Sequence, residues 1–443
     1  MRLAIFLSLF VITVSVAMID AQTPAEFGDI WEREHVSSIL PSNVRHTDLK
    51  EYLDGLNGSG ITVNEVGRSV AGKEIYQVEF GKGPLKVFLW SQMHGDEPTA
   101  TSALVDLFAI LRRNHDKDWV KRIANAITVR AVPMLNPDGT EQYIRRNLQG
   151  LDINRDALNL KSPEARLLKR LRDEWSPNIG FNLHNQNALT TVGATNKQAA
   201  ISLLVVYGDE KKTTSEGHER NKRLVSEMIK AIEPFIPGHI GRYDDEFTAT
   251  AFGDNFSAWG TPVILIETGA LYGKSEMFLV KMNFIAIATA LRSLADGSEK
   301  SVSPVAYELL PNNSSGRLMD FIFRSATLPV VKVGPDNRKS VEFLIASIGA
   351  NTSRRREEFA APTVIRSIGD LSAIAGLEEY DASGFYAVGR FQPLAAGHFG
   401  EILFYRKDRQ IDWTVADLEK SFPPDAIFSL GKWLKGENVV PKK

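Results

Sequence analysis

Two histidines and a glutamate stand where a metal site can form. His94 and Glu97 are three residues apart and follow the apolar run Lys86–Ser91, and His184 directly follows the apolar run Ile179–Leu183. A catalytic zinc ion takes three nitrogen or oxygen ligands from the protein and keeps a further position for water. The pattern therefore predicts that His94, Glu97 and His184 hold one Zn²⁺ per chain. Taken alone, the first pair would also suit a surface turn, and His184 a hydrogen-bonded core position.

Glu267 is a candidate base because it lies near the end of the apolar stretch "VILIET", Val263–Thr268. A carboxylate at the end of a buried strand costs free energy unless it has a partner or a task. Beside a metal ion, it can accept a proton from water and later deliver it to the leaving amine. We predict that Glu267 is the general base, and a structural ion pair is the alternative.

The segment "IRRNLQGLDINRD" carries side chains suited to holding a substrate, namely Arg145, Asn154 and Arg155. The planar guanidinium of arginine donates two parallel hydrogen bonds to a carboxylate. One arginine can thus hold a substrate carboxylate, while another polarises the scissile carbonyl and stabilises the oxyanion. The alternative is that these loop charges are simply solvated.

Composition narrows the function further. The chain has 443 residues, no cysteine, and a net charge of −2 from 52 basic and 54 acidic residues. Thiolate zinc sites, disulfides and cysteine nucleophiles are therefore excluded. The balanced charge gives no reason to expect a nucleic-acid partner.

These candidate residues need a sheet that brings strand ends together. Short apolar runs without alternation, typical of strands covered on both faces, alternate here with helical patterns. The expected strands are Lys86–Ser91, Ile127–Pro133, Ile179–Leu183, Ser202–Tyr207 and Val263–Thr268, and the expected helices are Pro98–Arg113, Pro163–Glu174, Glu216–Glu233 and Ser275–Leu294. This alternation predicts an α/β fold with helices on both faces of the sheet. In such sheets the site lies at the carboxyl ends of the strands.

The two ends of the chain have a different character. Residues 1–21 have Arg2, an apolar core and Ala21, and are expected to be a signal peptide; an uncleaved anchor is the alternative. Residues 22–298 are expected to form the catalytic domain. Residues 299–443 hold short strand patterns between turns and are expected to form a smaller β-rich accessory domain. "SRRREE", Ser353–Glu358, is expected to be a solvated loop.

The whole set resembles the zinc carboxypeptidase family, the carboxypeptidase A-type enzymes. The resemblance rests on His94-x-x-Glu97, Asn136-Pro-Asp-Gly139, Arg145, Asn154-Arg155, His184 and Glu267 in this order. It implies a mixed, mostly parallel eight-stranded sheet, zinc held by His94, Glu97 and His184, and Glu267 as the general base. It also implies that Arg145 polarises the carbonyl and that Asn154 and Arg155 grip the terminal carboxylate. Asp254 matches a family aspartate in the segment before the base and is predicted to bind substrate.

Two positions depart from the family pattern. Members carry a mobile tyrosine a little over twenty residues before the base, where this chain has Asp245, Glu246 or Phe247, with Tyr243 nearby. Whether a tyrosine covers the substrate is left open. Gly253 is expected at the base of the specificity pocket, so no aspartate there selects a basic side chain.

The sequence thus predicts an exported zinc-dependent metallocarboxypeptidase, periplasmic or secreted, that acts on peptides or small amides with a free carboxylate. After removal of the signal peptide no stable membrane partner is expected. Two alternatives stay open: a zinc-dependent amidohydrolase or deacylase acting on acyl-amino acids or cell-wall peptides, and a non-catalytic peptide-binding module. The preferred side chain, the physiological substrate and the oligomeric state do not follow from the sequence.

Overall fold

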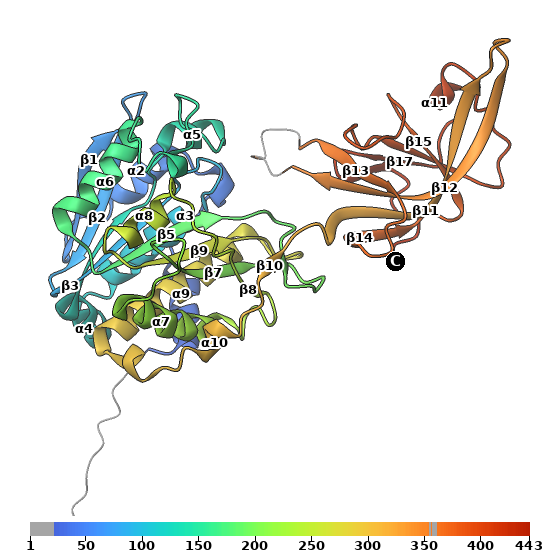
Figure 1. The fold of residues 1–443 in the computed structure, drawn as a ribbon. Helices are drawn as coiled ribbons and strands as arrows, with labels where there is room; N and C mark the ends of the chain where they lie inside the picture. The colour runs from blue at the N-terminus through green and yellow to red at the C-terminus, as the bar shows by residue number, and fades with distance from the viewer. Residues whose placement is uncertain (1–21, 354–355, 357–360) are drawn as a thin grey trace, which may run out of the picture.

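The computed structural model describes residues 22–353, 356 and 361–443. The signal peptide expected at residues 1–21 lies outside these described residues and stays a prediction. Figure 1 shows an α/β domain and a smaller β-rich domain beside it. We call them the α/β domain, elements α1 to α10, and the β domain, elements β11 to β18.

Among the described residues, the α/β domain has an eight-stranded sheet in the order β1-β2-β4-β3-β5-β9-β7-β8. The strands are β1 (Ile61–Arg68), β2 (Glu74–Gly81), β3 (Leu85–Ser91), β4 (Ile127–Val132), β5 (Ile179–Asn185), β7 (Ile201–Val206), β8 (Ile240–Arg242) and β9 (Val263–Thr268). Strands β4, β3, β5 and β9 are parallel neighbours at the centre, and β8 is parallel to β7. The other pairings, β1–β2, β2–β4 and β7–β9, are antiparallel. The predicted mixed, mostly parallel sheet is confirmed.

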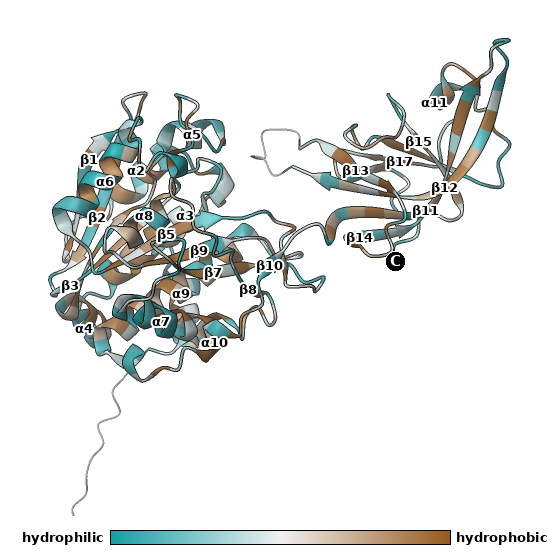
Figure 2. Cartoon of the chain, viewed as in Figure 1, coloured by the Kyte–Doolittle hydropathy of each residue, from teal (hydrophilic) through white to brown (hydrophobic). Residues whose placement is uncertain are grey.

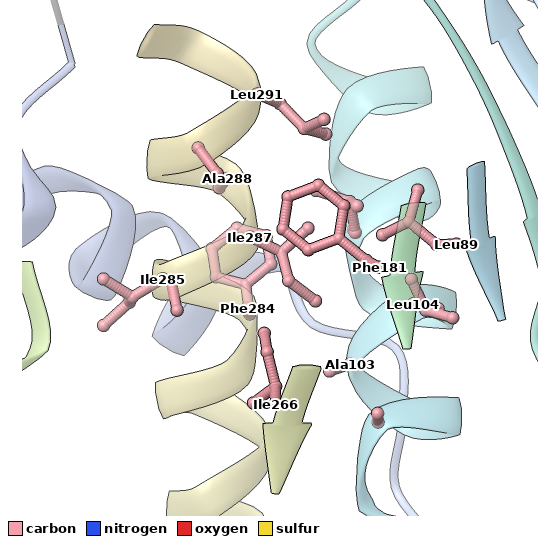
Figure 3. Close-up of a cluster of buried hydrophobic side chains, with 14 of the residues drawn as sticks. Leu89, Ala103, Leu104, Phe181, Ile266, Phe284, Ile285, Ile287, Ala288 and Leu291 are labelled. Carbon is pink, nitrogen blue, oxygen red and sulfur yellow. The ribbon is translucent and has the colours of Figure 1, made fainter. Parts of the chain in front are cut away.

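Helices cover this sheet on both faces, as predicted. They are α1 (Pro24–Glu34), α2 (His46–Asp54), α3 (Thr99–Arg113), α4 (Asp118–Ala126), α5 (Pro137–Gln142), α6 (Pro163–Trp175), α7 (Glu216–Ile232), α8 (Phe252–Ala258), α9 (Glu276–Asp296) and α10 (Val305–Glu308), with 3-10 turns at Pro41–Asn43, Ile153–Arg155 and Ser298–Ser301. On one face, Phe284 and Ile287 of α9 lie near Phe181 of β5 (Figure 3). Helices α6 and α8 build the core on the other face.

The central strands are apolar throughout because each successive side chain enters a different core. On β3, Val87 and Leu89 belong to the core that α3 and α9 cover, whereas Phe88 and Trp90 belong to the core under α6 and α8. A strand buried on both faces has no polar face to show. This is why the runs that predicted β3, β5 and β9 lack alternation.

Helix α9 owes its apolar sequence to this burial. It is the one helix in the described part of the chain that is long and apolar enough to cross a membrane, and 78% of the apolar window is buried in the fold. Figure 2 shows that α9 is largely hydrophobic, whereas α7 carries hydrophilic residues along its outer side.

The β domain contains a second sheet with an aromatic core. Its strands are β11 (Leu318–Val333), β12 (Lys339–Thr352), β13 (Thr363–Gly369), β14 (Ala375–Asp381), β15 (Phe385–Gly389), β16 (Ile402–Arg406), β17 (Ala426–Ser429) and β18 (Lys432–Lys435), with the short helix α11 (Leu418–Ser421). Phe323 packs against Phe404, Phe428 and Trp433. The β-rich C-terminal domain is therefore confirmed. The boundary at residue 298 stays a prediction; Tyr307 of α10, beyond it, is buried in the α/β core.

Arg356 departs from the expected solvated loop. Its side chain is 2% exposed. Its guanidinium donates to backbone carbonyls of the α/β domain, those of Ser42 at 3.0 Å, Glu141 at 2.8 Å and Thr140. Carbonyl oxygens replace water around this charge, so an arginine in a charged run can be buried.

The fold brings the predicted site residues to one edge of the sheet. His184 and Glu267 are direct partners in the parallel β5–β9 ladder, at the carboxyl ends of both strands. Side chains two residues apart on a strand point to the same face of the sheet. His184 and Glu267 therefore lie on the same face as Asn182 and Leu265, which is the face that α8 covers. His94 follows the end of the neighbouring strand β3 by three residues, so a loop brings it to the same place.

Candidate metal centre and active site

His94, Glu97 and His184 form a buried cluster, which we call the triad. Oε1 of Glu97 lies 2.8 Å from Nδ1 of His94, and Oε2 lies 2.6 Å from Nδ1 of His184. The imidazole centroids are 4.9 Å apart. One nitrogen or oxygen atom from each residue lies within 4.8 Å of the others. The structure thus brings together the three predicted ligands from separate parts of the chain.

The loop that carries His94 and Glu97 turns at a place where only glycine fits. A Cβ on Gly95 would lie 2.0 Å from the carbonyl carbon of Gly139, so the two backbones touch. Asn185, next to His184, then fixes the end of the loop. Its backbone N–H donates to Oε2 of Glu97 at 3.2 Å, and its side-chain oxygen accepts from the N–H of Thr99 at 3.2 Å.

Asp152 is a site residue that the sequence analysis missed. Its Oδ1 lies 3.0 Å from Nε2 of His94 and accepts the backbone N–H of Asn154 at 2.9 Å. Its Oδ2 accepts Nε–H of Arg145 at 3.0 Å. A carboxylate on the far nitrogen of a metal-binding imidazole fixes its tautomer and orientation. The only signal in the sequence was proximity, because Asp152 lies two residues before the predicted Asn154.

Arg145 reaches the triad directly. Its Nη1 donates to Oε1 of Glu97 at 3.2 Å and lies 3.1 Å from Nδ1 of His94. The side chain is 42% exposed, whereas that of Glu97 is 10% exposed. The guanidinium therefore lies on the exposed side of the triad. There it can donate a hydrogen bond to a carbonyl group of a ligand while it keeps its bonds to the carboxylates of Glu97 and Asp152.

Burial and charge set the protonation of the triad. Burial lowers the pKa of His94, but the charge of Glu97 and hydrogen bonds to Asp152 and Glu97 outweigh it and raise the pKa to about 9. Burial also keeps the pKa of His184 below its ordinary value. Burial opposes the ionisation of Glu97, yet the two histidines hold the pKa of its carboxyl well below its usual range.

Glu267 lies beside the triad in a different environment. It is buried, and within the described residues no hydrogen bond reaches its carboxylate. Burial and the charge of Glu97 raise the pKa of Glu267 well above its ordinary value. A raised pKa brings a carboxyl toward the range in which it both accepts and returns a proton near neutral pH.

Tyr243, which lies close in sequence to the position where the family pattern has a tyrosine, lines the site. It lines the same cavity as Glu267, and the charge of Glu267, followed by burial, raises the pKa of its phenol. The phenol therefore keeps its proton and can donate it in a hydrogen bond. Counting residues back from Glu267 did not find Tyr243, because that count depends on the length of the intervening loop.

The predicted substrate-binding residues Asn154, Arg155 and Asp254 line the same cavity as the triad. Oδ1 of Asn154 accepts the N–H of Phe252 at 2.9 Å, which ties the 3-10 turn at Ile153–Arg155 to α8. The exposed Arg155 donates to the carbonyl of Asn154 at 2.8 Å. Burial raises the pKa of Asp254 to about 6, although the charge of Arg155 opposes this shift.

One cavity of about 150 Å³ joins all these groups. The predicted residues that line it are His94, Glu97, Arg145, Asn154, Arg155, His184, Asp254 and Glu267. Gly253 also lines it, where a Cβ would lie 3.0 Å from Nδ2 of Asn182. Oδ1 of Asn182 is buried and has no hydrogen-bond partner in the described part of the chain. The roles assigned to these residues stay predictions, but their assembly around one cavity is a property of the fold.

The donor set fits a divalent metal ion. Two imidazole nitrogens and one carboxylate, all buried and mutually close, match the His₂Glu ligands of catalytic zinc sites. The carboxylate of Asp152 on His94 supplies the outer hydrogen bond that such ligands need. Nε2 of His184 is buried and has no partner among the described residues.

Comparison with known proteins agrees with this assembly. The family model for zinc carboxypeptidases matches residues 49–234. A probable carboxypeptidase 2 of Trichophyton verrucosum is 29% identical over 109 residues, 25% of this chain and 21% of the relative. Carboxypeptidase D of Rattus norvegicus is 28% identical over 168 residues, 33% of this chain and 12% of the relative. The chain therefore spans about a fifth or less of the length of these relatives.

Among solved structures, a metallo-carboxypeptidase from Burkholderia cenocepacia is similar over 57% of this chain and 69% of that chain. Its TM-score is 0.47 and its sequence identity 16%.

Proposed function

We propose that this protein is a zinc-dependent metallocarboxypeptidase that hydrolyses the C-terminal peptide bond, because the family model for zinc carboxypeptidases matches residues 49–234. The observation that carries the proposal is the convergence of His94, Glu97 and His184 beside Glu267 in one cavity. Glu267 lies outside the matched segment, so its role is supported by its position in the fold.

The triad supplies the metal ligands. When bound there, zinc would lower the pKa of a water molecule and polarise the scissile carbonyl. Asp152 holds His94 so that Nδ1 faces Glu97 and the centre of the triad. Arg145, anchored by Asp152 and Glu97, donates to the carbonyl oxygen as negative charge develops on it.

Glu267 moves the proton. Its carboxylate accepts a proton from the attacking water and passes the same proton to the leaving amine, so the residue ends each turnover unchanged. Its buried position beside His184, at the carboxyl end of β9 and next to the triad, supports this role.

Arg155 and Asn154 hold the free carboxylate of the substrate. The guanidinium of Arg155 is exposed toward the cavity and offers two parallel N–H groups. Asn154 is fixed by its bonds to Phe252 and Asp152. A substrate held here presents its last peptide bond to Arg145 and Glu267, which favours an exopeptidase over an endopeptidase.

Export is a further part of the proposal. It rests on the sequence of residues 1–21, in which Arg2 precedes an apolar stretch and Ala21 ends a plausible cleavage site. The protein is expected in the periplasm or the medium with Gln22 as its first residue. Cell fractionation followed by N-terminal sequencing measures this.

The decisive experiment is the digestion of short peptides with zinc-loaded protein, followed by mass spectrometry. We expect loss of single C-terminal residues, abolished by a zinc chelator and restored by zinc. Glu267→Gln should lower kcat by about 10²–10⁴-fold and leave the zinc content unchanged. Glu164→Gln, a buried carboxyl outside the cavity, is the matched control. Hydrolysis that survives chelation would refute the proposal.

A further inference from the structure

A second cavity, of about 970 Å³, lies between the two domains. It shares Glu97, Arg145 and Asn185 with the triad cavity. Asn154 and Arg155, which hold the terminal carboxylate in the proposed function, line only the triad cavity. We call the larger space the interdomain groove; it adjoins the triad cavity at these three shared residues.

We propose that the β domain forms the outer wall of the substrate site, so that the residues upstream of the scissile bond lie in the interdomain groove. This inference rests on the proposed function and adds a substrate class to it, peptides with several residues before the bond that is cut. A cavity of this size holds a ligand of drug-like dimensions, about three residues of extended peptide.

The groove has walls from both domains. Asn187 and Lys274 line it on the α/β side, and Asn351, Thr352 and Arg366 line it on the β side. Amide and hydroxyl groups match the peptide groups of an extended chain, each of which offers one donor and one acceptor. Within the described residues, no hydrogen bond or ion pair occupies the exposed guanidinium of Arg366.

The charges in the groove favour a peptide over a polyanion. Lys274 and Arg366 are matched by Asp320 and Glu378 on the same walls. Phe321 adds an apolar surface there. A nucleic acid or another polyphosphate would require an excess of basic residues, whereas a peptide of mixed composition suits both signs and an apolar patch.

Three contacts hold the β domain against the groove. Arg356 donates to the carbonyls of Ser42 and Glu141, as described above. Strand β10 (Asn313–Ser314) pairs with β6 (Thr191–Val192) at the junction. The side-chain amide of Asn313 in β10 donates to Oε1 of Gln186 at 2.7 Å. The outer wall is therefore fixed in place by bonds at separate points.

The test measures how activity depends on peptide length. The substrates are N-acetylated alanine peptides of two to six residues, each ending in the residue that the full-length, zinc-loaded enzyme removes best. We expect kcat/KM to rise by at least tenfold from the shortest peptide to those of four or five residues and then level off. Arg366→Ala should lower the ratio of kcat/KM for the five-residue and two-residue peptides by at least fivefold.

Arg338→Ala is the matched control, because Arg338 is an arginine of the β domain with 89% side-chain exposure that does not line the groove. It should leave the ratio unchanged. If the enzyme is active but its kcat/KM does not change with peptide length, the inference is refuted and the proposed function stands. The same holds if Arg366→Ala leaves the ratio of kcat/KM for the five-residue and two-residue peptides unchanged. If no peptide is cleaved, the proposed function fails. Titration calorimetry of the zinc-loaded protein with the same peptides then decides between length-dependent and length-independent binding.

Discussion

The substitution Asp152→Asn tests how much Asp152, which contacts the proposed ligand His94, contributes to metal binding while the three proposed ligands stay unchanged. It removes one charge and keeps the size of the side chain. Asp152 accepts from Arg145 at 3.0 Å and from the backbone of Asn154 at 2.9 Å, and it lies 3.0 Å from Nε2 of His94. An asparagine has one side-chain oxygen, and its NH₂ group cannot accept from either His94 or Arg145.

The magnitude follows from these bonds. If the remaining oxygen of residue 152 serves His94, the amide nitrogen faces Nε–H of Arg145, and a charge-assisted bond worth about 1.5–3 kcal/mol is lost. If the oxygen serves Arg145, the support of His94 is lost instead. Replacing such an outer carboxylate typically weakens metal affinity by about 10–100-fold. We therefore expect the zinc Kd to rise by about 10–100-fold, or about 1.4–2.7 kcal/mol.

The assay is a zinc titration in metal buffers that fix the free ion concentration, with activity and bound metal measured on the same samples. At saturating zinc, kcat should still fall by about tenfold or more, because Arg145 is less well held. Asp106→Asn is the matched control. Asp106 is buried and accepts from the backbone N–H groups of Ser37 at 2.8 Å and Val36 at 2.9 Å, and it does not line the cavity of the triad. A zinc Kd for Asp152→Asn within twofold of the wild type would refute this account of the site.

Three further predictions follow from the same contacts. Zinc at about 100 times its Kd should raise the free energy of unfolding by about 2.7 kcal/mol, and Glu97→Gln should abolish this gain in a thermal shift assay. Because the pKa of Asp254 is raised to about 6, the folded state holds a proton that the unfolded state loses above about pH 4. Asp254 should make stability fall by up to about 3 kcal/mol as the pH rises from 4 to 7, and Asp254→Asn should show a smaller fall than the wild type in urea denaturation, because it lacks this contribution. Arg356→Gln should lower the free energy of unfolding by about 2–3 kcal/mol, since buried carbonyls lose their donors; Arg366→Gln, on the surface, should change it by less than about 0.5 kcal/mol.

The triad was predictable because each member stands next to a strand that is apolar on both faces. Unbroken apolar runs in the sequence predict such strands, and parallel neighbouring strands have their carboxyl ends at the same edge of the sheet. His184 and Glu267 are residues of this kind, paired across β5 and β9. His94 and Glu97 follow β3, the other neighbour of β5. Their convergence depends on the order of the strands in the sheet, which the apolar runs did not predict.

Asp152 and Tyr243 were not predictable in the same way, because loops place them. Asp152 is 58 residues from His94 in sequence and reaches it only after the chain has returned from Arg145 through the turn at Asn147–Leu151. Tyr243 follows the short edge strand β8, where its N–H bonds to the carbonyl of Leu203 at 3.1 Å. A loop of different length would put another residue there, and residue counting cannot detect that.

Arg356 illustrates a different limit. A run of arginines and glutamates is normally solvated, and nothing in the run itself distinguishes its third arginine. Its burial depends on the carbonyls of Thr140 and Glu141, which accept from its guanidinium at the end of the short helix α5. Helix ends leave carbonyl groups without partners inside the helix, so the complement to Arg356 lies in a different domain, 215 residues away.

These contacts converge on one short segment, Asn136–Arg145. Near its start, the side chain of Asn136 donates to the carbonyl of Met93 at 3.2 Å, and Gly139 packs against Gly95 in the loop that carries the triad. Near its middle, Arg356 of the β domain binds the carbonyls, and its last residue is Arg145. A rigid segment with contacts at both ends transmits a displacement that a flexible loop would absorb. The segment therefore joins the contact with Arg356 of the β domain to Arg145 and to the loop that bears His94.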